Sequence, residues 1–500
     1  MSDLPSTIQF LVTPASLGLM ALGTSLGVIV GAVPGLTGAM LIALTLPLTF
    51  GMSGESALIL LVSMYVGSVS GGLITATLLR MPGTPAAIMT TLDGFPLAKR
   101  GQAGRALGLG VSASFVGGMI SWGFLVLLAK PMADWSVSFG PFEFFALVLM
   151  ALVLMASVGG PSLSKGLLSG FLGILAAMPG TSPGTGQVRW TFGIHAMDDG
   201  FNLLPVLIGL FAVNQIIRDI VHIDEPIESI QLNRRGLFLR LADWKKQGVN
   251  LMRSSVIGTW IGILPGIGAN IGSIVAYSAA RSTSKEPEQF GNGSEEGIVA
   301  SEAANNATVG GALIPLIAIG VPGSVIDAIL LGALVIHGLQ PGPLLFAEQP
   351  QIVYTIMGTM LLANIFMFVF MLASVGWLSK LSRVPRSLML PVILTFCVVG
   401  SFALANRSFD VWVMLGFGLF GFALERMRIP LAPFVIGFVL APVAEEHLSA
   451  GLLQSGGSFL PLITRPVSLA FCLVAAAMLG WTLVRRSRGR HRMPATGESA

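Results

Sequence analysis

The chain has 500 residues, of which 53% are hydrophobic and only 10% are charged, and its formal net charge is +4. Soluble proteins carry about 25% charged residues, so this composition cannot cover a water-facing surface. It excludes soluble enzymes, nucleic-acid-binding proteins and secreted disulfide scaffolds. Charge-free runs such as 106–129 and 352–374 are long enough to cross a bilayer. The sequence therefore predicts an all-α integral membrane protein, a polytopic helical bundle.

Apolar segments follow one another along the whole chain. In chain order we expect spans near 9–30, 57–80, 106–129, 142–160, 164–180, 201–216, 254–281, 297–320, 352–374, 387–404, 411–424, 429–442 and 467–484. We interpret residues 1–500 as one polytopic transmembrane domain.

Basic residues gather in alternate connections between these spans. The connection 217–253 and the tail 485–500 are the most basic, and that side of the chain collects 21 of the 28 Lys and Arg residues. The opposite side holds acidic or mixed connections, such as 285–296. Because short basic loops stay in the cytoplasm, we expect the loop 217–253 and the C-terminal tail to be cytoplasmic.

The chain repeats a pattern of glycine and proline. Gly27, Gly31, Pro34 and Gly35 recur 231 residues later, and Gly71, Pro82 and Gly83 recur 240 residues later. Repeat one covers about 15–105 and repeat two about 250–345. The first repeat ends in the basic segment 99–105, whereas the second ends in 340–351, which has no basic residue. Opposite charge at equivalent ends predicts two inverted repeats with Pro-Gly-broken or re-entrant helices.

Such breaks in inverted repeats are typical of secondary transporters, whose site lies near the midplane of the membrane. Proline removes a backbone donor and glycine permits non-helical dihedral angles, so each break frees backbone groups that can bind a ligand. The N-terminus of a half-helix suits a carboxylate in particular. An ordinary kink with a capping hydroxyl is the alternative. The candidate binding residues at the breaks are Pro34, Gly35, Thr37, Gly38, Pro82, Gly83, Thr84, Pro265, Gly266, Gly268, Asn270, Gly323 and Ser324.

Polar side chains inside the span 297–320 add three candidates, Asn305, Asn306 and Thr308. Amides donate to carboxylates and accept from hydroxyls, so these side chains suit a hydroxylated polycarboxylate. They suit a bond between helices equally well. The glycines at spacing four, Gly23, Gly27 and Gly31, favour a close-packed helix face over a ligand surface.

Six stretches of the chain share a recognisable pattern. They are GAVPGLTGAMLIALTLPLTF (31–50), TSPGTGQVRWTFGIHAMDDG (181–200), GILPGIGANIGSIVAYSAAR (262–281), EGIVASEAANNATVGGALIPL (296–316), IGVPGSVIDAILLGALVIHGLQPGP (319–343) and the segment 441–465. Together the stretches resemble the large membrane subunit, or permease, of the tripartite tricarboxylate transporter family. The resemblance runs from about residue 15 to residue 480.

The resemblance implies a multi-pass permease of the bacterial inner membrane. It implies two protein partners, a periplasmic solute-binding protein and a small transmembrane subunit, beside the lipid bilayer. It also implies import of tricarboxylates such as citrate, or of related small carboxylates, driven by an ion gradient of Na+ or H+. No G-x-x-x-x-G-K-[ST] phosphate loop occurs in the chain, so we expect no ATP, no cofactor and no nucleic acid as partner. A carboxylate transporter that needs no binding protein is the alternative function.

Asp327 is the candidate for ion coupling, because it lies one helical turn after the break at Gly323. A carboxylate at the bilayer centre is normally paired, protonated or functional. The alternative is an Asp at a helix N-terminus that stabilises the helix dipole. For Arg80 we favour an interfacial position over substrate binding, and for His337 a helix-end position over proton relay. For Arg189, docking of a binding protein and an ordinary loop position stay open.

An enzymatic function has weak support in the sequence. Gly51-Met52-Ser53-Gly54 matches a short motif of intramembrane serine proteases, but no histidine occurs before His195. The zinc protease motif H-E-x-x-H is absent as well. We therefore expect no catalytic residues, no metal site and no enzyme.

Overall fold

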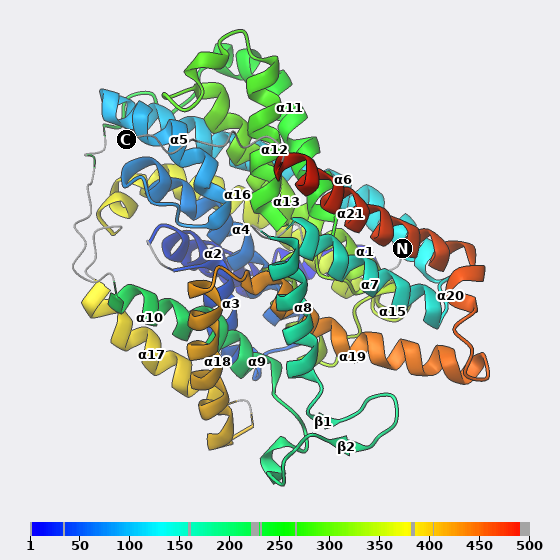
Figure 1. Ribbon diagram of the computed structural model, residues 1–500. Helices are drawn as coiled ribbons and strands as arrows, with labels where there is room; N and C mark the ends of the chain where they lie inside the picture. The colour runs from blue at the N-terminus through cyan, green and yellow to red at the C-terminus, as the bar shows by residue number, and fades with distance from the viewer. Residues whose placement is uncertain are drawn as a thin grey trace, which may run out of the picture. The chain divides into compact units, whose positions relative to one another are not determined.

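A computed structural model describes residues 3–33, 36–158, 162–221, 230, 233–265, 268–381, 386–403 and 405–490 (Figure 1). Helices make up most of these residues, and their one sheet is a two-stranded antiparallel pair. Seven helical segments in this part of the chain are long and apolar enough to cross a membrane. The predicted all-α polytopic membrane fold is confirmed.

The chain forms two compact units. The first comprises Met1–Ser138 and Phe201–Arg426, and the second comprises Phe139–Gly200 and Met427–Ala500. The helices of the first unit are α1 (Asp3–Leu11), α2 (Pro14–Gly31), α3 (Gly38–Thr45), η1 (Leu46–Thr49), α4 (Gly54–Leu78), η2 (Pro85–Ala87), α5 (Ile88–Leu97), η3 (Ala98–Gln102), α6 (Ala103–Ser136), α9 (Leu203–Ile208), η5 (Gly209–Val213), α10 (Asn214–Val221), α11 (Leu241–Ile263), α12 (Gly268–Thr283), η6 (Pro287–Gln289), α13 (Glu295–Ile319), α14 (Val325–Ile336), α15 (Pro343–Glu348), α16 (Pro350–Leu381), α17 (Arg386–Ala403) and α18 (Ser408–Arg426).

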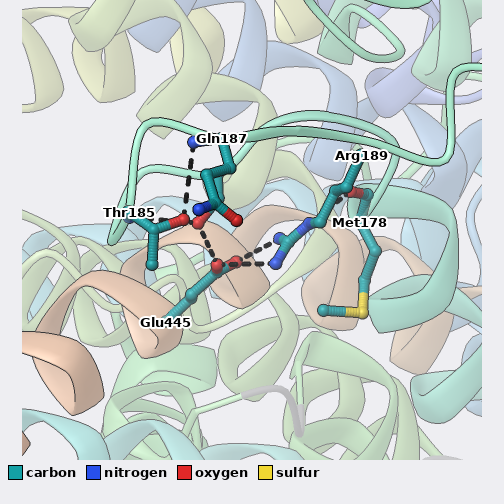
Figure 2. Close-up of polar contacts among 6 residues, drawn as sticks. Met178, Thr185, Gln187, Arg189 and Glu445 are labelled. Carbon is teal, nitrogen blue, oxygen red and sulfur yellow. Dashed lines mark hydrogen bonds and ion pairs between the residues drawn. The ribbon is translucent and has the colours of Figure 1, made fainter.

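The second unit contains α7 (Pro141–Val158), α8 (Leu163–Ala177), β1 (Gly180–Thr181), β2 (Val188–Arg189), η4 (His195–Met197), α19 (Leu431–Gln454), α20 (Pro461–Thr464) and α21 (Pro466–Arg490). Figure 1 shows its β-hairpin extending beyond the end of α8. Figure 2 shows how Arg189 and Glu445 hold this hairpin. The Arg189 guanidinium donates to both carboxylate oxygens of Glu445, at 2.8 and 2.5 Å, and to the carbonyl oxygen of Met178. Arg189 thus joins two of the stretches that carried the family resemblance, 181–200 and 441–465.

Two helices form the centre of the first unit. Every residue from Ala57 to Leu78 of α4 and from Gly297 to Ile319 of α13 is buried. Each helix begins at a serine, Ser53 or Ser294, whose hydroxyl accepts from a backbone N–H three residues later. Ser53, the serine of the protease-like motif, therefore caps a helix. Helix α13 ends at Gly320, whose φ of 78° is the left-handed conformation that glycine adopts freely.

The expected span 254–281 is two helices that turn back on themselves, and its prediction as one span is wrong. Helices α11 and α12 meet at the Pro265 break, and the far end of α12 returns to α11, where Arg253 donates to Thr283. The expected loop 217–253 is accordingly helical at both ends, in α10 and α11; residues 222–229, 231 and 232 lie outside the described residues. Helices α11 and α12 therefore form a hairpin.

The placement of 285–296 opposite the basic loops is also wrong. Asp93 of α5 accepts from the backbone N–H groups of Gly291, Gly293 and Ser294. Arg105 of α6 binds Glu295 and Asp243 at 2.8 and 2.7 Å. Because the α11–α12 hairpin does not cross to the other side, its closing loop lies at the same end as the basic segment 99–105.

Glycines let the backbones of two helix pairs touch. A Cβ atom on Gly27 or Gly31 of α2 would lie 2.4 Å from the carbonyl oxygen of Met64 or Ser68 in α4. A Cβ atom on Gly258 or Gly262 of α11 would lie 2.4 or 2.6 Å from the carbonyl oxygen of Ala304 or Thr308 in α13. All these contacts are closer than real Cβ contacts permit. The expected close-packed glycine face is confirmed.

We expect Gly27→Ala to destabilise the protein, because the added methyl group meets backbone that cannot move aside. Overpacking of this kind costs about 1–3 kcal/mol. The measurement is the thermal unfolding midpoint of purified protein. The control is Gly18→Ala in the same helix, where a Cβ atom has nothing within 4 Å. Equal midpoints for the two variants would contradict the backbone contact.

Candidate functional site

Both repeats place a broken helix beside the two central helices. Helix α3 begins after the first break, and Thr37 caps it by accepting from the N–H of Met40 at 3.2 Å. Helix α14 begins after the fourth break, and Ser324 caps it by accepting from the N–H of Asp327 at 3.4 Å. Helix α12 begins at Gly268, whose φ is 68°. The breaks therefore place the N-termini of three helices, α3, α12 and α14, within the first unit.

Contacts bring these N-termini toward one another. A Cβ atom on Gly38 would lie 2.2 Å from Ser68 Oγ and 3.3 Å from Ile326 Cδ1 of α14. A Cβ atom on Gly268 would lie 3.8 Å from the Cβ of Ser324. Segments almost 300 residues apart in sequence thus meet around Ser68 and Ser324. A helix N-terminus carries free N–H groups and a positive partial charge, so this place suits an anion.

The glycines of the remaining breaks make backbone contacts. A Cβ atom on Gly83 would lie 2.3 Å from the carbonyl oxygen of Gly31, and one on Gly323 would lie 2.8 Å from that of Gly262. In each repeat, this break therefore packs against the glycine-bearing helix of the same repeat, α2 in the first and α11 in the second. The Thr84 hydroxyl is buried and has no hydrogen-bond partner. Pro265 is buried, whereas Pro82 and Asn270 are exposed. Pro34, Gly35 and Gly266 lie outside the described residues.

The polar residues of α13 lie where this helix meets α4. Ser70 donates to Asn306 Oδ1 at 2.6 Å, and Asn306 Nδ2 donates to the Glu302 carbonyl oxygen at 3.2 Å. Thr308 donates to the carbonyl oxygen of Asn305. Asn305 Nδ2 reaches the carbonyl oxygen of Val69, but its Oδ1 is buried without a partner. Asn306 thus links the helices, whereas Asn305 keeps a free acceptor.

Asp327 lies entirely inside the first unit, with 0% of its surface exposed. Its Oδ2 accepts from Ser324 at 2.5 Å and from the Tyr65 hydroxyl at 3.5 Å, while its Oδ1 has no partner. No cationic side chain among the described residues forms an ion pair with it. A buried carboxylate with an unfilled oxygen can hold a proton or a cation.

Several side chains near the site were not foreseen from the sequence. Tyr65 reaches Asp327, and Glu302 is a second fully buried carboxylate, in contact with Thr90 and Ser114. Glu302 could have been noticed as the charged residue of the expected span 297–320. The position of Tyr65 opposite Asp327 has no local signal, because it arises from helices that are distant in sequence.

Four other ionisable residues lie away from the helix N-termini. Arg80 is exposed and its guanidinium stacks over Phe95, 5.8 Å from the ring centroid. His337 follows the end of α14, where its Nε2 lies 3.1 Å from the Thr49 hydroxyl oxygen. Hydrogen bonds from Arg105 lower the pKa of Asp243 to about 2, so this pair at the basic end is ionised at neutral pH.

Comparisons with known proteins agree with the fold. The sequence model of the tripartite tricarboxylate transporter TctA family matches residues 17–436. An uncharacterised 52.8 kDa protein from the TAR-I ttuC' 3' region of Agrobacterium vitis is 32% identical over 490 residues, which cover 98% of this chain and 97% of the relative. A second uncharacterised protein, from the TAR-II ttuC' 3' region of the same organism, is 34% identical over 227 residues, or 45% of this chain and 91% of the relative. No solved structure matches the chain. The chain belongs to the tripartite tricarboxylate transporter TctA family.

Proposed function

We propose that this membrane subunit imports tricarboxylates or related small carboxylates across the bacterial inner membrane, driven by an ion gradient. Family membership supports a large subunit of a tripartite system. The observation that carries the proposal is the meeting of the α3, α12 and α14 N-termini around Ser68 and Ser324. Carboxylates bind at such termini through backbone N–H groups, with no need for a cationic side chain.

The proposed substrate site includes the free polar atoms beside these termini. Thr84 Oγ1 and Asn305 Oδ1 are buried without partners. Thr84 packs against Gly72 of α4, and Asn305 donates to the carbonyl oxygen of Val69 of the same helix. Because Val69 and Gly72 are three residues apart, the Thr84 and Asn305 side chains contact the same turn of α4. Either atom can accept from a substrate hydroxyl, and the Thr84 hydroxyl can also donate to a carboxylate.

Contacts at the two ends of the first unit support inverted repeats. At one end Arg105 binds Glu295, which joins the close of repeat one to the start of α13. At the other end Thr49 contacts His337, which joins the start of α4 to the close of repeat two. Helices α4 and α13 therefore run in opposite directions between the same two ends. In our proposal the end with Arg105 is cytoplasmic, and the basic residues of the C-terminal tail independently favour a cytoplasmic C-terminus.

Cysteine labelling tests this topology. In a variant without Cys397 and Cys472, single cysteines at Gln102 and Asn292 should be inaccessible to a membrane-impermeant thiol reagent in intact cells. A cysteine at Glu348 should be labelled, because it lies at the opposite end. All three positions are exposed. Equal labelling of Gln102 and Glu348 would contradict the inversion.

Dependence on a periplasmic binding protein tests the tripartite mechanism. Uptake of radiolabelled citrate and of other small carboxylates is measured in cells that contain the complete system. Deletion of the binding protein should reduce uptake to background, because in this mechanism the substrate reaches the permease only in bound form. Full uptake without the binding protein would favour the alternative, an independent secondary transporter.

Asp327 is the proposed site of ion coupling. An ionised Asp327 at the α14 N-terminus would repel an anionic substrate, whereas a proton or Na+ on its free Oδ1 would remove that repulsion. Asp327→Asn keeps the shape of the side chain and removes the charge. We expect normal membrane insertion, loss of accumulation against a gradient, and loss of dependence on Na+ or pH.

Uptake and counterflow in membrane vesicles measure these effects. The control is Asp134→Asn, an exposed aspartate that pairs with Lys130. Accumulation by Asp327→Asn with unchanged Na+ and pH dependence would show that Asp327 only caps its helix.

A further inference from the structure

Glu302 is a buried carboxylate beside Asn305 of the proposed substrate site, and the proposed function gives it no role. It lies in the second turn of α13, and none of its surface is exposed. Its Oε1 lies 2.5 Å from Thr90 Oγ1 of α5, and its Oε2 lies 3.2 Å from Ser114 Oγ of α6. Thr90 Oγ1 in turn lies 3.0 Å from Ser301 Oγ. Two helices thus present hydroxyl groups to this carboxyl, and the side-chain amide of Asn305 on α13 itself donates to it as well.

No cation neutralises Glu302 in the part of the chain that the structure describes. The ionisable groups on the elements around α13 have other partners. Asp93 of α5 accepts hydrogen bonds from Tyr277 of α12 and from the loop before α13. Arg105 of α6 forms ion pairs with Asp243 of α11 and with Glu295. Arg253 of α11 donates to Asn250 and Thr283. Tyr65 of α4 contacts Asp327 of α14, while Arg281 of α12 and Glu348 of α15 make no hydrogen bond or ion pair with Glu302. An ionised carboxylate in this position would be buried without a counter-charge, which is unfavourable at the depth of a membrane.

The surrounding hydroxyls satisfy both protonation states of the carboxyl. In the ionised form, Thr90, Ser114 and the Asn305 amide donate to its two oxygens. In the protonated form, Glu302 donates to Thr90, Thr90 donates to Ser301, and Ser301 donates to the carbonyl oxygen of Gly297, 3.0 Å away. A hydroxyl both donates and accepts, so the same side chains serve both forms after rotation of their hydrogens. The site can therefore gain or lose a proton without a change in packing.

The spacing of the oxygens favours a proton over a metal ion. Thr90 Oγ1 and Glu302 Oε1 are 2.5 Å apart, which is the separation of a strong O–H···O hydrogen bond. The Thr90 hydroxyl hydrogen lies between these two oxygens, so a proton already links them.

We propose that Glu302 takes up and releases a proton during the transport cycle, with Thr90 as a positioning residue. This inference rests on the proposed transport function. Thr90 belongs to α5, the helix that follows the break at Gly83. The backbone carbonyl oxygen of Glu302 accepts a hydrogen bond from Asn306, the residue that links α13 to α4. A shift of α5 that accompanies substrate binding would separate Thr90 from Glu302, expose the carboxyl, and change its proton affinity.

Infrared spectroscopy of the full-length protein in lipid tests the proposal without a substrate. A pH titration should show the carbonyl band of a protonated carboxylic acid that disappears as pH rises. Glu302→Gln should lower this band by the contribution of one carboxyl and leave that of Asp327, whereas Glu296→Gln, a partly exposed residue of the first turn of the same helix, should retain the full band. Retention of all titrating carboxyl signal in Glu302→Gln would overturn the proposal. So would removal of the band by Na+ at constant pH, because a metal ion would then occupy the site.

A second variant keeps the test decisive if Glu302→Gln fails to fold. Thr90→Val preserves the shape of the side chain and removes its hydroxyl, and should move the midpoint of the band by about one pH unit, a tenfold change in proton affinity. The control is Thr91→Val, whose hydroxyl binds the carbonyl oxygen of Ile88. An unmoved midpoint in Thr90→Val would contradict its positioning role.

Transport measurements separate this proposal from the proposed function. In vesicles with the complete system, Glu302→Gln should abolish citrate accumulation driven by a pH gradient and retain citrate counterflow. If the unchanged protein transports no carboxylate at all, the proposed function fails while the infrared result still decides the protonation of Glu302. If it transports citrate and Glu302→Gln leaves the pH dependence intact, Glu302 has no part in coupling and the present proposal is wrong.

Discussion

Backbone contact between helices is the constraint on which the rest of the first unit depends. Lipid is as apolar as a helix surface, so helices in a membrane associate through close packing and hydrogen bonds rather than through the hydrophobic effect. Gly27 and Gly31 bring α2 against α4, and Gly258 and Gly262 bring α11 against α13, at distances that exclude any side chain. The two central helices are consequently buried along almost their whole length.

This burial explains how unsatisfied backbone can exist at the depth of a membrane. A broken helix exposes N–H and carbonyl groups that lipid cannot satisfy, so the break must be enclosed by protein or water. The start of α3 at Gly38 packs on Ser68 and Ile326, and the break before α14 packs on Gly262 through Gly323. Protein therefore lies against both of these places. The same enclosure removes water from Asp327 and Glu302, and so makes their charge state depend on what binds them.

Much of this organisation could be predicted from glycine and proline alone. Gly27 and Gly258 mark helix faces, and the prolines mark where helices stop, because these residues act through local backbone geometry. The fold class and the family followed from the same stretches. The side of the loop 285–296 could not be predicted in this way, because a re-entrant hairpin reverses the alternation of loops. The link between Arg105 and Glu295 that reveals it joins residues 190 positions apart in sequence.

The candidate site was only partly accessible to sequence reasoning, for a related reason. Asp327 was noticed because it follows a break, whereas Glu302 lies between small residues in an unbroken helix and gives no local signal of its partners. Thr90 and Ser114 come from two other helices. Sequence patterns reveal residues that act on their own backbone, and side-chain partners across helices require the fold.

The two repeats share their glycines and helix breaks but differ in their charged residues. Glycines and breaks occur in both, but the positions equivalent to Glu302 and Asp327 in repeat one are Val62 and Ala87. In an inverted pair, exchange of the conformations of the two repeats interchanges the outward-facing and inward-facing states. Identical side chains would therefore give those states equal intrinsic free energies. Glu302 and Asp327 have no carboxyl counterpart in repeat one and so make the states unequal, and a proton or cation that binds one of them shifts the balance by its difference in affinity for the two states. In our proposal these two residues are the ones through which an ion gradient acts on the symmetric arrangement of helices.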